Sequence, residues 1–401
     1  MADMLEYLHS KGGDLEAPCQ EGKTPLYYAA DADAFGAVKY LVDKNVDVNA
    51  MSNDGLAPVH ATNKLEIVKF LFEHGATDPS KGLYRASSVD ETETVEFLLE
   101  NGADINYINQ INCKTALHNA ADYGYPSLAQ FLVGKNADID LKSSDSGMTA
   151  LHFASRFNYL PIVQLLIEKN ASIDETNNAG QTAVQMAAEC GNFEIVQLLA
   201  EKGANILSVD NDGFNALYFA ANREIASYLV EHGASYTSVP QALHYAITNR
   251  NAETVKFLIE NYANVDEKLE EGLTPLLLTA KVGDVDTTNY LLDKNANVQA
   301  KDDLGKTPLH YAAAFGVYWS LEIAAAILEK KPELEAKDNE GQTPLLAAAI
   351  GGSRDMVELL VSKGAEIDAK DNDGITALGH AAKNGHDDVA AFLREKGAIQ
   401  K

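Results

Sequence analysis

The stretch Lys301-Asp302-Asp303-Leu304-Gly305-Lys306-Thr307-Pro308-Leu309-His310-Tyr311-Ala312-Ala313-Ala314 decides the fold. It opens with a turn sequence and continues as the start of a helix. The Thr307 hydroxyl can cap the first helical turn, and a proline is tolerated at the first helical position because the N–H that it lacks would have no helical partner there. The alanines that follow let a neighbouring helix pack closely. The stretch therefore predicts a turn followed by a short, closely packed helix.

This Thr-Pro/Ala-Leu pattern recurs along the whole chain, which indicates an internal repeat. The copies begin at Thr24, Thr115, Thr149, Thr182, Thr274, Thr307, Thr343 and Thr376, with degenerate copies at Ala57, Asn215 and Gln241. Six of the intervals between successive copies are 33 residues long. Each copy continues into a second helical pattern, such as residues 357–360. A repeat of this length predicts a stack of small, similar units.

The second helix of each repeat ends where the backbone needs a left-handed conformation, which glycine and asparagine adopt most readily. The residues in this position are Gly75, Gly102, Gly203, Gly233, Gly364 and Gly397, together with Asn45, Asn136, Asn170 and Asn295. Tyr262 and Lys331 occupy it in two repeats. We expect those two helices to end differently or to bear strain.

With these motifs in register, the chain resembles the ankyrin repeat family over essentially its whole length. The resemblance implies an all-α solenoid of helix-turn-helix units with short β-hairpin or turn fingers, in which neighbouring units bury a continuous core. We expect a single array over residues 1–401, with a partial repeat at residues 1–18 and about twelve repeats over residues 19–401.

Three repeats depart from the pattern. Those near residues 57–80 and 215–240 are shortened in the interhelical turn and in the hairpin, either to suit a partner or through drift, because changes of loop length cost little. The repeat that begins at Thr307 is enlarged near residues 316–321, and we expect Val317 to Ser320 to lie in its interhelical turn. The only tryptophan, Trp319, either contacts a partner there or packs on its own helix pair.

The family resemblance implies that partners are contacted by the hairpin tips and the end of the first helix. At and near these positions the chain carries Tyr123, Tyr125, Phe157, Tyr159, Leu304, Phe315, Tyr318 and Trp319. Large aromatic side chains at a turn predict a binding surface, and the alternative is packing between neighbouring repeats. In addition, Asn49 resembles the site that asparagine hydroxylases modify in ankyrin proteins.

No set of residues predicts catalysis or a metal site. The resemblance implies that the repeat histidine, found at His60, His118, His152, His244 and His310, is a structural hydrogen-bonding residue. Successive copies would lie about 10 Å apart, which is too far to share a metal ion. Gly22-Lys23-Thr24 and Gly305-Lys306-Thr307 lack the earlier glycine of a phosphate-binding loop. We therefore expect no enzyme, no cofactor and no metal.

The chain is strongly acidic, with 32 basic and 59 acidic residues and a formal net charge of −27. Residues 1–200 carry 13 basic and 28 acidic side chains and residues 201–401 carry 19 and 31, so the acidity is spread along the array. Such a surface repels phosphate backbones and attracts basic proteins. We expect a protein partner with a basic surface and no nucleic acid.

Other features concern the compartment. Cys19, Cys113 and Cys190 are far apart and have no disulfide or zinc spacing, which suggests a reducing, cytoplasmic setting. The N-terminus shows no secretory pattern. The apolar stretch 309–328 approaches membrane length but contains His310 and Glu322, so we expect a buried helix pair and no membrane insertion. We also expect a monomer.

These observations leave three hypotheses of function. The first is a protein-interaction scaffold or adaptor that binds a partner on its concave, hairpin-bearing face. The second is a recognition array that belongs to a larger multidomain protein, such as an effector, a channel, a toxin or an enzyme subunit. The third is an elastic spacer. The fold alone does not choose among them.

Overall fold

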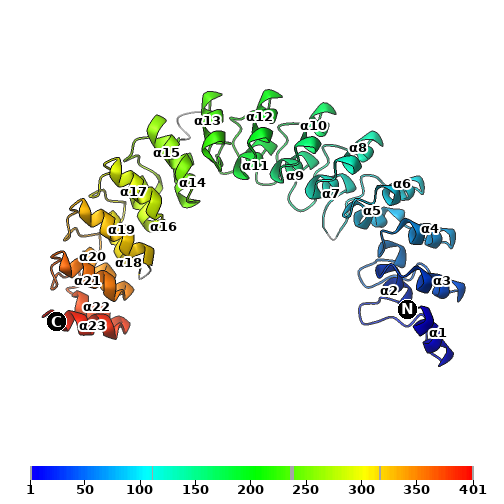
Figure 1. Ribbon diagram of the computed structural model, residues 1–401, viewed down its shortest axis with the longest axis horizontal. Coiled ribbons are helices and arrows are strands. Elements are labelled where there is room, and N and C mark those ends of the chain that lie inside the picture. Colours follow the sequence, from blue (N-terminus) through cyan, green and yellow to red (C-terminus); the bar gives the residue numbers. More distant parts are fainter. Residues whose placement is uncertain (1, 111, 235–238, 316–317, 400–401) are drawn as a thin grey trace. The chain divides into compact units, whose positions relative to one another are not determined.

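The computed structural model describes residues 2–110, 112–234, 239–315 and 318–399, and they form short helices joined by turns (Figure 1). Within these ranges there is no strand, and the only ladder-like pairing is an isolated antiparallel bridge between Lys370 and Thr376. The expectation of an all-α fold is confirmed.

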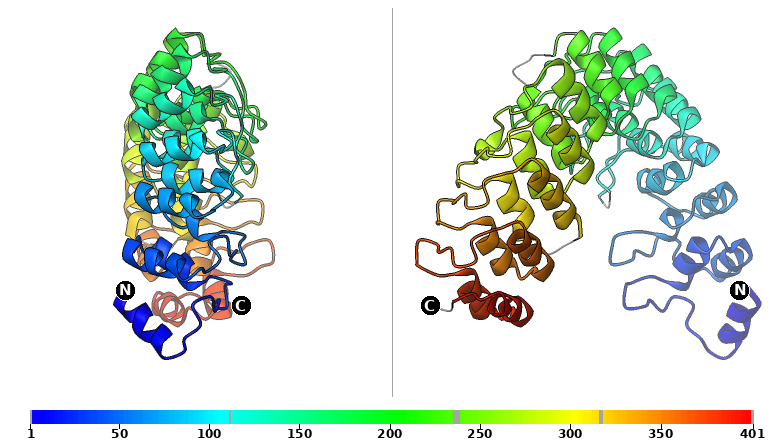
Figure 2. Two further views of the ribbon diagram at one scale, coloured as in Figure 1. Left: turned by 90° about the vertical axis from the view of Figure 1, so that its right-hand side faces the viewer. Right: turned by 60° about the vertical axis from the view of Figure 1, so that its left-hand side comes forward.

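The helices group into two compact parts, which are described separately. The N-terminal part comprises Met1–Asn205 and Val209–Asp212, and the C-terminal part comprises Ile206–Ser208 and Gly213–Lys401. In each part the first helices of successive repeats lie side by side in one row and the second helices in another (Figure 1). The turns that precede the first helices project from one edge of each part (Figure 2).

The first helices of the N-terminal part are α2 (Pro25–Asp31), η1 (Pro58–His60), α5 (Pro79–Ser87), α7 (Ala116–Tyr123), α9 (Ala150–Arg156) and α11 (Ala183–Glu189). Its second helices are α1 (Ala2–Ser10), α3 (Phe35–Asp43), α4 (Leu65–Glu73), α6 (Thr92–Glu100), α8 (Pro126–Gly134), α10 (Leu160–Glu168) and α12 (Phe193–Glu201).

In the C-terminal part the first helices are α14 (Val239–Thr248), α16 (Pro275–Val282), α18 (Pro308–Ala314), α20 (Pro344–Gly351) and α22 (Ala377–Asn384), with the short η3 (Glu270–Gly272) before α16. The second helices are α13 (Arg223–Glu231), α15 (Ala252–Asn261), α17 (Val285–Asp293), α19 (Tyr318–Glu329), α21 (Arg354–Ser362) and α23 (Asp387–Glu395).

The threonine and alanine positions behave as the sequence predicts. Thr24 accepts the N–H of Tyr27 at 3.3 Å, and Thr274 and Thr343 cap α16 and α20 in the same way. Most alanines of the first helices, such as Ala312 and Ala313, are fully buried. Small side chains there let neighbouring first helices approach closely, so the core is continuous within each part.

Two shortened repeats keep their second helix but not a full first helix. In the repeat that begins at Ala57 the first helix is only the single turn η1. In the repeat that begins at Asn215, residues 216–219 form a turn, and residues 235–238 lie outside the described residues. The number of repeats and their boundaries remain predictions.

The enlarged repeat is arranged differently from our expectation. Residues 316 and 317 lie outside the described residues, but Tyr318, Trp319 and Ser320 form the first turn of α19, so their assignment to the interhelical turn is wrong. The additional residues lengthen this helix to 12 residues, whereas its neighbours α17 and α21 have nine. The Ser320 hydroxyl donates to the carbonyl of Phe315 at 2.7 Å, which holds the new helix start in place.

Glycines in the projecting turns have two reasons to be glycine: a positive φ and the close approach of a side chain from the next repeat. Gly22 has a φ of +76°, and a Cβ at this position would lie 2.5 Å from Oδ1 of Asn53 in the following repeat. The amide of Asn53 donates to the carbonyl of Gln20 at 3.0 Å. Equivalent contacts join Gly147 to Asn178, Gly180 to Asn211, Gly305 to Asn339 and Gly341 to Asn372. The turns are therefore fitted to one another in pairs.

The repeat histidine joins neighbouring repeats. In His118, Nδ1 accepts the N–H of Thr115 at 3.1 Å, and Nε2 donates to the carbonyl of Leu141 in the next repeat at 2.8 Å. His60, His152 and His310 make the same two contacts. In contrast, His244 lies inside α14, with Nδ1 3.9 Å from a carboxylate oxygen of Glu270. Its assignment to the common role is wrong because α14 begins before the position of the usual cap.

These links require a neutral imidazole. Burial lowers the pKa of His118 and of His152 to about 4. The unfolded chain binds protons with the ordinary histidine pKa of about 6.5, so the folded state loses stability as the pH falls from about 6.5 toward 4.

The sequence supplies a non-titrating version of the first of these two contacts. Gln185 stands in the histidine position, and its Oε1 accepts the N–H of Thr182 at 2.7 Å. We predict that the double variant His118→Gln and His152→Gln loses less stability than the wild type between pH 7 and pH 4.5, by about 2 kcal/mol or more. Urea unfolding at the two pH values measures this, and equal losses in both proteins would contradict it.

The helix ends at Lys331 and Tyr262 differ, and each follows one of the two expectations, backbone strain or a different ending. Lys331 adopts the left-handed conformation with φ +56°, whereas Tyr262 ends α15 with φ −138° and avoids it. A side chain in the left-handed region costs about 1 kcal/mol.

We therefore predict that Lys331→Gly stabilises the chain by about 1 kcal/mol, because it removes the Cβ clash. Tyr262→Gly is the control and should give no such gain. Thermal unfolding of the two variants compares them, and a lower midpoint for Lys331→Gly would show that this position bears no strain.

Candidate partner-binding surface

The aromatic candidates of the N-terminal part form pairs on two adjacent repeats. Tyr123 is the last residue of α7 and Phe157 follows α9, and these side chains are 46% and 44% exposed. Tyr125 and Tyr159 immediately precede α8 and α10. The ring centroids of Tyr123 and Tyr125 lie 6.1 Å apart, and those of Phe157 and Tyr159 lie 6.5 Å apart. We call these four residues the aromatic strip.

The two members of each pair have different roles. The Tyr125 hydroxyl donates to the carbonyl of Ser88 in the preceding repeat at 3.3 Å, and burial raises the pKa of Tyr125. The ring of Tyr159 lies on Gly124, where a Cβ would come within 2.3 Å of it. Tyr125 and Tyr159 thus contact the preceding repeat. Tyr123 and Phe157 form the exposed surface of the strip.

The candidates of the C-terminal part divide in the same way. Leu304, Phe315 and Tyr318 are exposed, by 57%, 41% and 82%. The Trp319 ring packs on Gly283 of the preceding repeat, where a Cβ would lie 2.6 Å from it. Trp319 also lies 5.5 Å from the Phe315 ring. Trp319 thus packs on its own helix pair, which is one of the two predicted alternatives, and also on the preceding repeat.

We predict that Trp319→Ala destabilises the chain by about 2 kcal/mol, because it removes a large packed side chain, whereas Tyr318→Ala changes stability by less than about 0.5 kcal/mol. The midpoints of urea unfolding measure both effects. If the two variants were equally stable, the packing role of Trp319 would be excluded.

Asn49 belongs to a series of links between repeats. Its Nδ2 donates to the carbonyl of Gly75 at 2.8 Å, and its Oδ1 accepts the N–H of Thr77 at 2.9 Å. Carboxylates and amides at the same repeat position accept an N–H from the next repeat elsewhere, as Asp140 does from Ser172. The side chain of Asn49 is thus engaged at both ends. Its modification remains a prediction.

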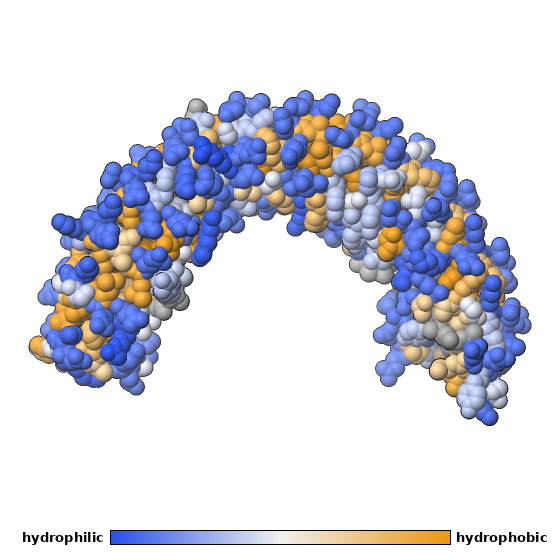
Figure 3. Space-filling view, viewed as in Figure 1, coloured by the Kyte–Doolittle hydropathy of each residue, from blue (hydrophilic) through white to orange (hydrophobic). Residues whose placement is uncertain are grey.

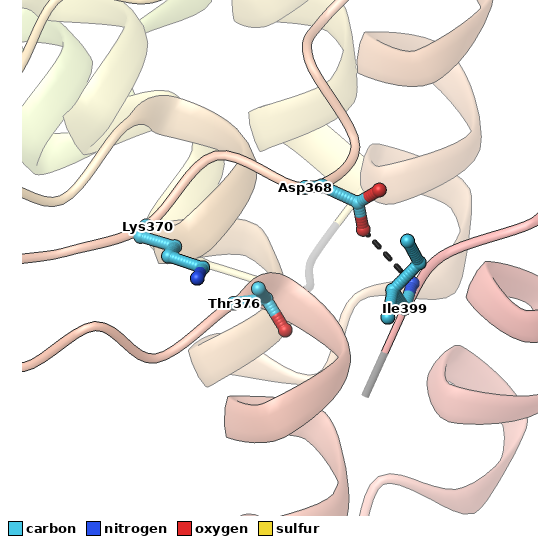
Figure 4. A pocket seen from close by; sticks show the side chains of 4 residues that line it. All are labelled: Asp368, Lys370, Thr376 and Ile399. Carbon is cyan, nitrogen blue, oxygen red and sulfur yellow. Dashed lines mark hydrogen bonds between the residues drawn. The ribbon is translucent and has the colours of Figure 1, made fainter. Parts of the chain in front are cut away.

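The last described link of this series borders a small pocket of the C-terminal part (Figure 4). A carboxylate oxygen of Asp368 accepts the N–H of Ile399 at 2.9 Å, and Lys370 and Thr376 line the same space. The polar groups there belong to the stacking of the array, so we assign no ligand to this pocket.

A second arrangement was missed in the sequence. The aspartate that opens a turn pairs with the residue nine positions later: Oδ2 of Asp302 accepts the Tyr311 hydroxyl at 2.5 Å, and Oδ2 of Asp371 accepts Nε2–H of His380 at 2.6 Å. Burial opposes ionisation of Asp371, but hydrogen bonds from the N–H of Ile375 and from His380 lower its pKa. An aspartate followed nine residues later by a side-chain donor is the signal that could have revealed these pairs.

The described residues contain no cluster of three or more His, Cys, Asp or Glu side chains suited to a metal ion. Among them, no helix combines the length and the apolar character that crossing a membrane requires.

Comparison with known proteins agrees with the geometry. The family model for ankyrin repeats (3 copies) matches residues 1–81, 83–177, 170–239, 243–338 and 320–401. The chain belongs to the ankyrin repeat family. Arrays of this family generally mediate protein–protein interactions and are typically not catalytic.

Individual relatives match only segments of this ankyrin array. It is 34% identical over 128 residues to an L-asparaginase of Dirofilaria immitis, which covers 29% of this chain and 21% of that protein. It is 31% identical over 113 residues to human neurogenic locus notch homolog protein 2, which covers 26% of this chain and 5% of the relative. The chain is also 30% identical over 133 residues to the probable 26S proteasome regulatory subunit p28 of Saccharomyces cerevisiae. That match covers 30% of this chain and 58% of the yeast protein.

Proposed function

We propose that this ankyrin array is a scaffold or adaptor that binds a protein partner on the face formed by the first helices and the projecting turns. The observation that carries the proposal is the exposure of Tyr123, Phe157 and Phe315, which stand at the same repeat position at the end of a first helix. Earlier alanines of the same helices are buried, so the exposure begins only at the helix ends; they are Ala120, Ala121, Ala154, Ala312 and Ala313. Exposed aromatic side chains that recur on one face are typical of binding surfaces.

Charge supports a basic partner. The net charge of −27 is spread over the sequence, and hydrophilic residues cover much of the visible surface of both parts between strips of apolar residues (Figure 3). An acidic surface accelerates association with a basic protein and makes the affinity sensitive to salt. Aromatic anchors also stack on arginine and lysine side chains. We propose that the chain works as a monomer in a reducing, cytoplasmic compartment.

A second candidate is that the sequence is the recognition array of a larger protein. It is favoured by the relatives, since the matched segment is about a fifth of the L-asparaginase and 5% of the notch homolog. In that case the same face would bind a target and the catalytic or membrane-associated part would lie elsewhere.

The experiment is affinity capture at low salt with the wild type and with the triple variant Tyr123→Ala, Phe157→Ala and Phe315→Ala. We predict that the wild type retains basic proteins, that the triple variant retains them at least tenfold less, and that raising the salt concentration releases them. Quantitative mass spectrometry of the captured proteins gives the ratio.

The matched control replaces two half-buried aromatic residues of second helices, Phe131→Ala in α8 and Tyr290→Ala in α17. This control should bind as the wild type does. Retention of acidic proteins only, or unchanged capture by the triple variant, would rule out the proposed surface.

A further inference from the structure

A cavity of about 250 Å³ opens between α18 and α20 in the C-terminal part. Its lining includes the side chains of Tyr311 and Phe315, the small residues Ala314 and Ala347, and Ile350. Phe315 is one of the exposed aromatic residues predicted to bind a partner. Polar side chains also line the cavity, namely Lys306, His310, Asp338 and Gln342.

Asp338 is buried, with 7% of its surface exposed, and only one of its carboxylate oxygens is engaged. Oδ1 accepts the N–H of Glu340 at 3.0 Å and that of Gln342 at 2.8 Å. Among the described residues no group donates a hydrogen bond to Oδ2. Oδ2 is not enclosed, so a donor that enters the cavity can reach a carboxylate oxygen that no described protein group occupies, and hydrogen bonds to a charged acceptor are the stronger ones.

The repeats on either side satisfy the same oxygen from within. Asp302 and Asp371 use Oδ1 as Asp338 does, and their Oδ2 atoms accept hydrogen bonds from Tyr311 and His380, nine residues later. In the middle repeat the residue nine positions after Asp338 is Ala347. The cavity is therefore the space that an aromatic donor occupies in the two flanking repeats.

We propose that this cavity receives a tyrosine side chain of the protein partner, whose ring replaces the missing aromatic ring and whose hydroxyl donates to Oδ2 of Asp338. The inference rests on the proposed function and names one anchor of the partner. The lining of aromatic and aliphatic groups suits a ring, and the flanking repeats show that Tyr and His are the side chains that fill this space.

A neutral donor suits the site better than a cation. Lys306 lies at the same cavity, with Nζ 5.9 Å from the Tyr311 ring centroid, and it forms no ion pair within the described residues. Its charge offsets that of Asp338 and opposes the entry of a second cation. A partner arginine is the competing occupant, and the experiment separates the two.

The first test uses side-chain analogues as probes: p-cresol for tyrosine, toluene for phenylalanine and n-propylguanidinium for arginine. Titration followed by NMR of methyl groups at Ala314, Ala347 and Ile350 should show p-cresol binding about tenfold more tightly than toluene, because its hydroxyl donates to a carboxylate. Propylguanidinium should shift these signals least. Equal binding of p-cresol and toluene, or preferred binding of propylguanidinium, would overturn the proposal.

The second test fills the cavity from within. Ala347→Tyr should raise the unfolding midpoint above that of Ala347→Phe, and it should abolish p-cresol binding. The advantage of Tyr over Phe should shrink in the Asp338→Asn background. That background preserves the turn, since the equivalent Asn177 accepts the N–H groups of Ala179 and Gln181 at 2.9 Å. If Ala347→Tyr were no more stable than Ala347→Phe, the assigned hydrogen bond would be absent and the proposal would fail.

Partner capture separates this inference from the proposed function. We expect Ala347→Tyr to weaken capture while the control variant Phe131→Ala with Tyr290→Ala retains it. Full capture by Ala347→Tyr combined with loss in the triple aromatic variant would reject the tyrosine anchor and leave the proposed function intact. Unchanged capture in both variants would reject both.

Discussion

The structure depends on hydrogen bonds that the turn of one repeat makes with the next repeat. The turns carry N–H and carbonyl groups that have no partner inside their repeat, and the neighbouring repeat supplies the missing side chain. His118 donates to Leu141 in the next repeat, and Asp140 accepts an N–H from Ser172. Stacking therefore satisfies polar groups as well as burying the alanine-lined core. A single repeat in isolation would lose both contributions.

The same constraint explains how much of the fold the sequence predicts. The cap at Thr307, the buried alanines and the left-handed helix ends are local requirements, and they recur often enough to be recognised. Lys331 shows what the sequence does not predict. The pattern indicates an unusual helix end, but not whether the residue adopts the strained left-handed conformation or a different one. The distinction between Lys331 and Tyr262 depends on how the following loop packs.

The proposed binding surface was less predictable because it depends on which side chains the neighbouring repeat covers. Tyr123 and Tyr125 are alike in the sequence, yet the first is exposed and the second donates to Ser88. Trp319 looked like a contact residue, and it packs on Gly283. The pairing of Asp302 with Tyr311 joins residues nine positions apart across a turn, a spacing that helical periodicity does not reveal. A glycine at the end of a first helix, followed by a large residue at the start of the next repeat's second helix, is the pattern that marks Tyr159 and Trp319 as packed.

The contact of Gly22 with Asn53 has a consequence for how such a chain can change over evolution. A larger residue at the glycine would meet both the side chain and the backbone nitrogen of Asn53, at 2.5 and 2.8 Å, so a change in one turn requires the following turn to move as well. Each repeat is thus matched to its successor rather than to a general consensus. Recombination that duplicates two adjacent repeats together preserves the matched junction between them, whereas exchange of a single repeat with an unrelated array creates two mismatched junctions. The unit that evolution must preserve is therefore the interface between two adjacent repeats.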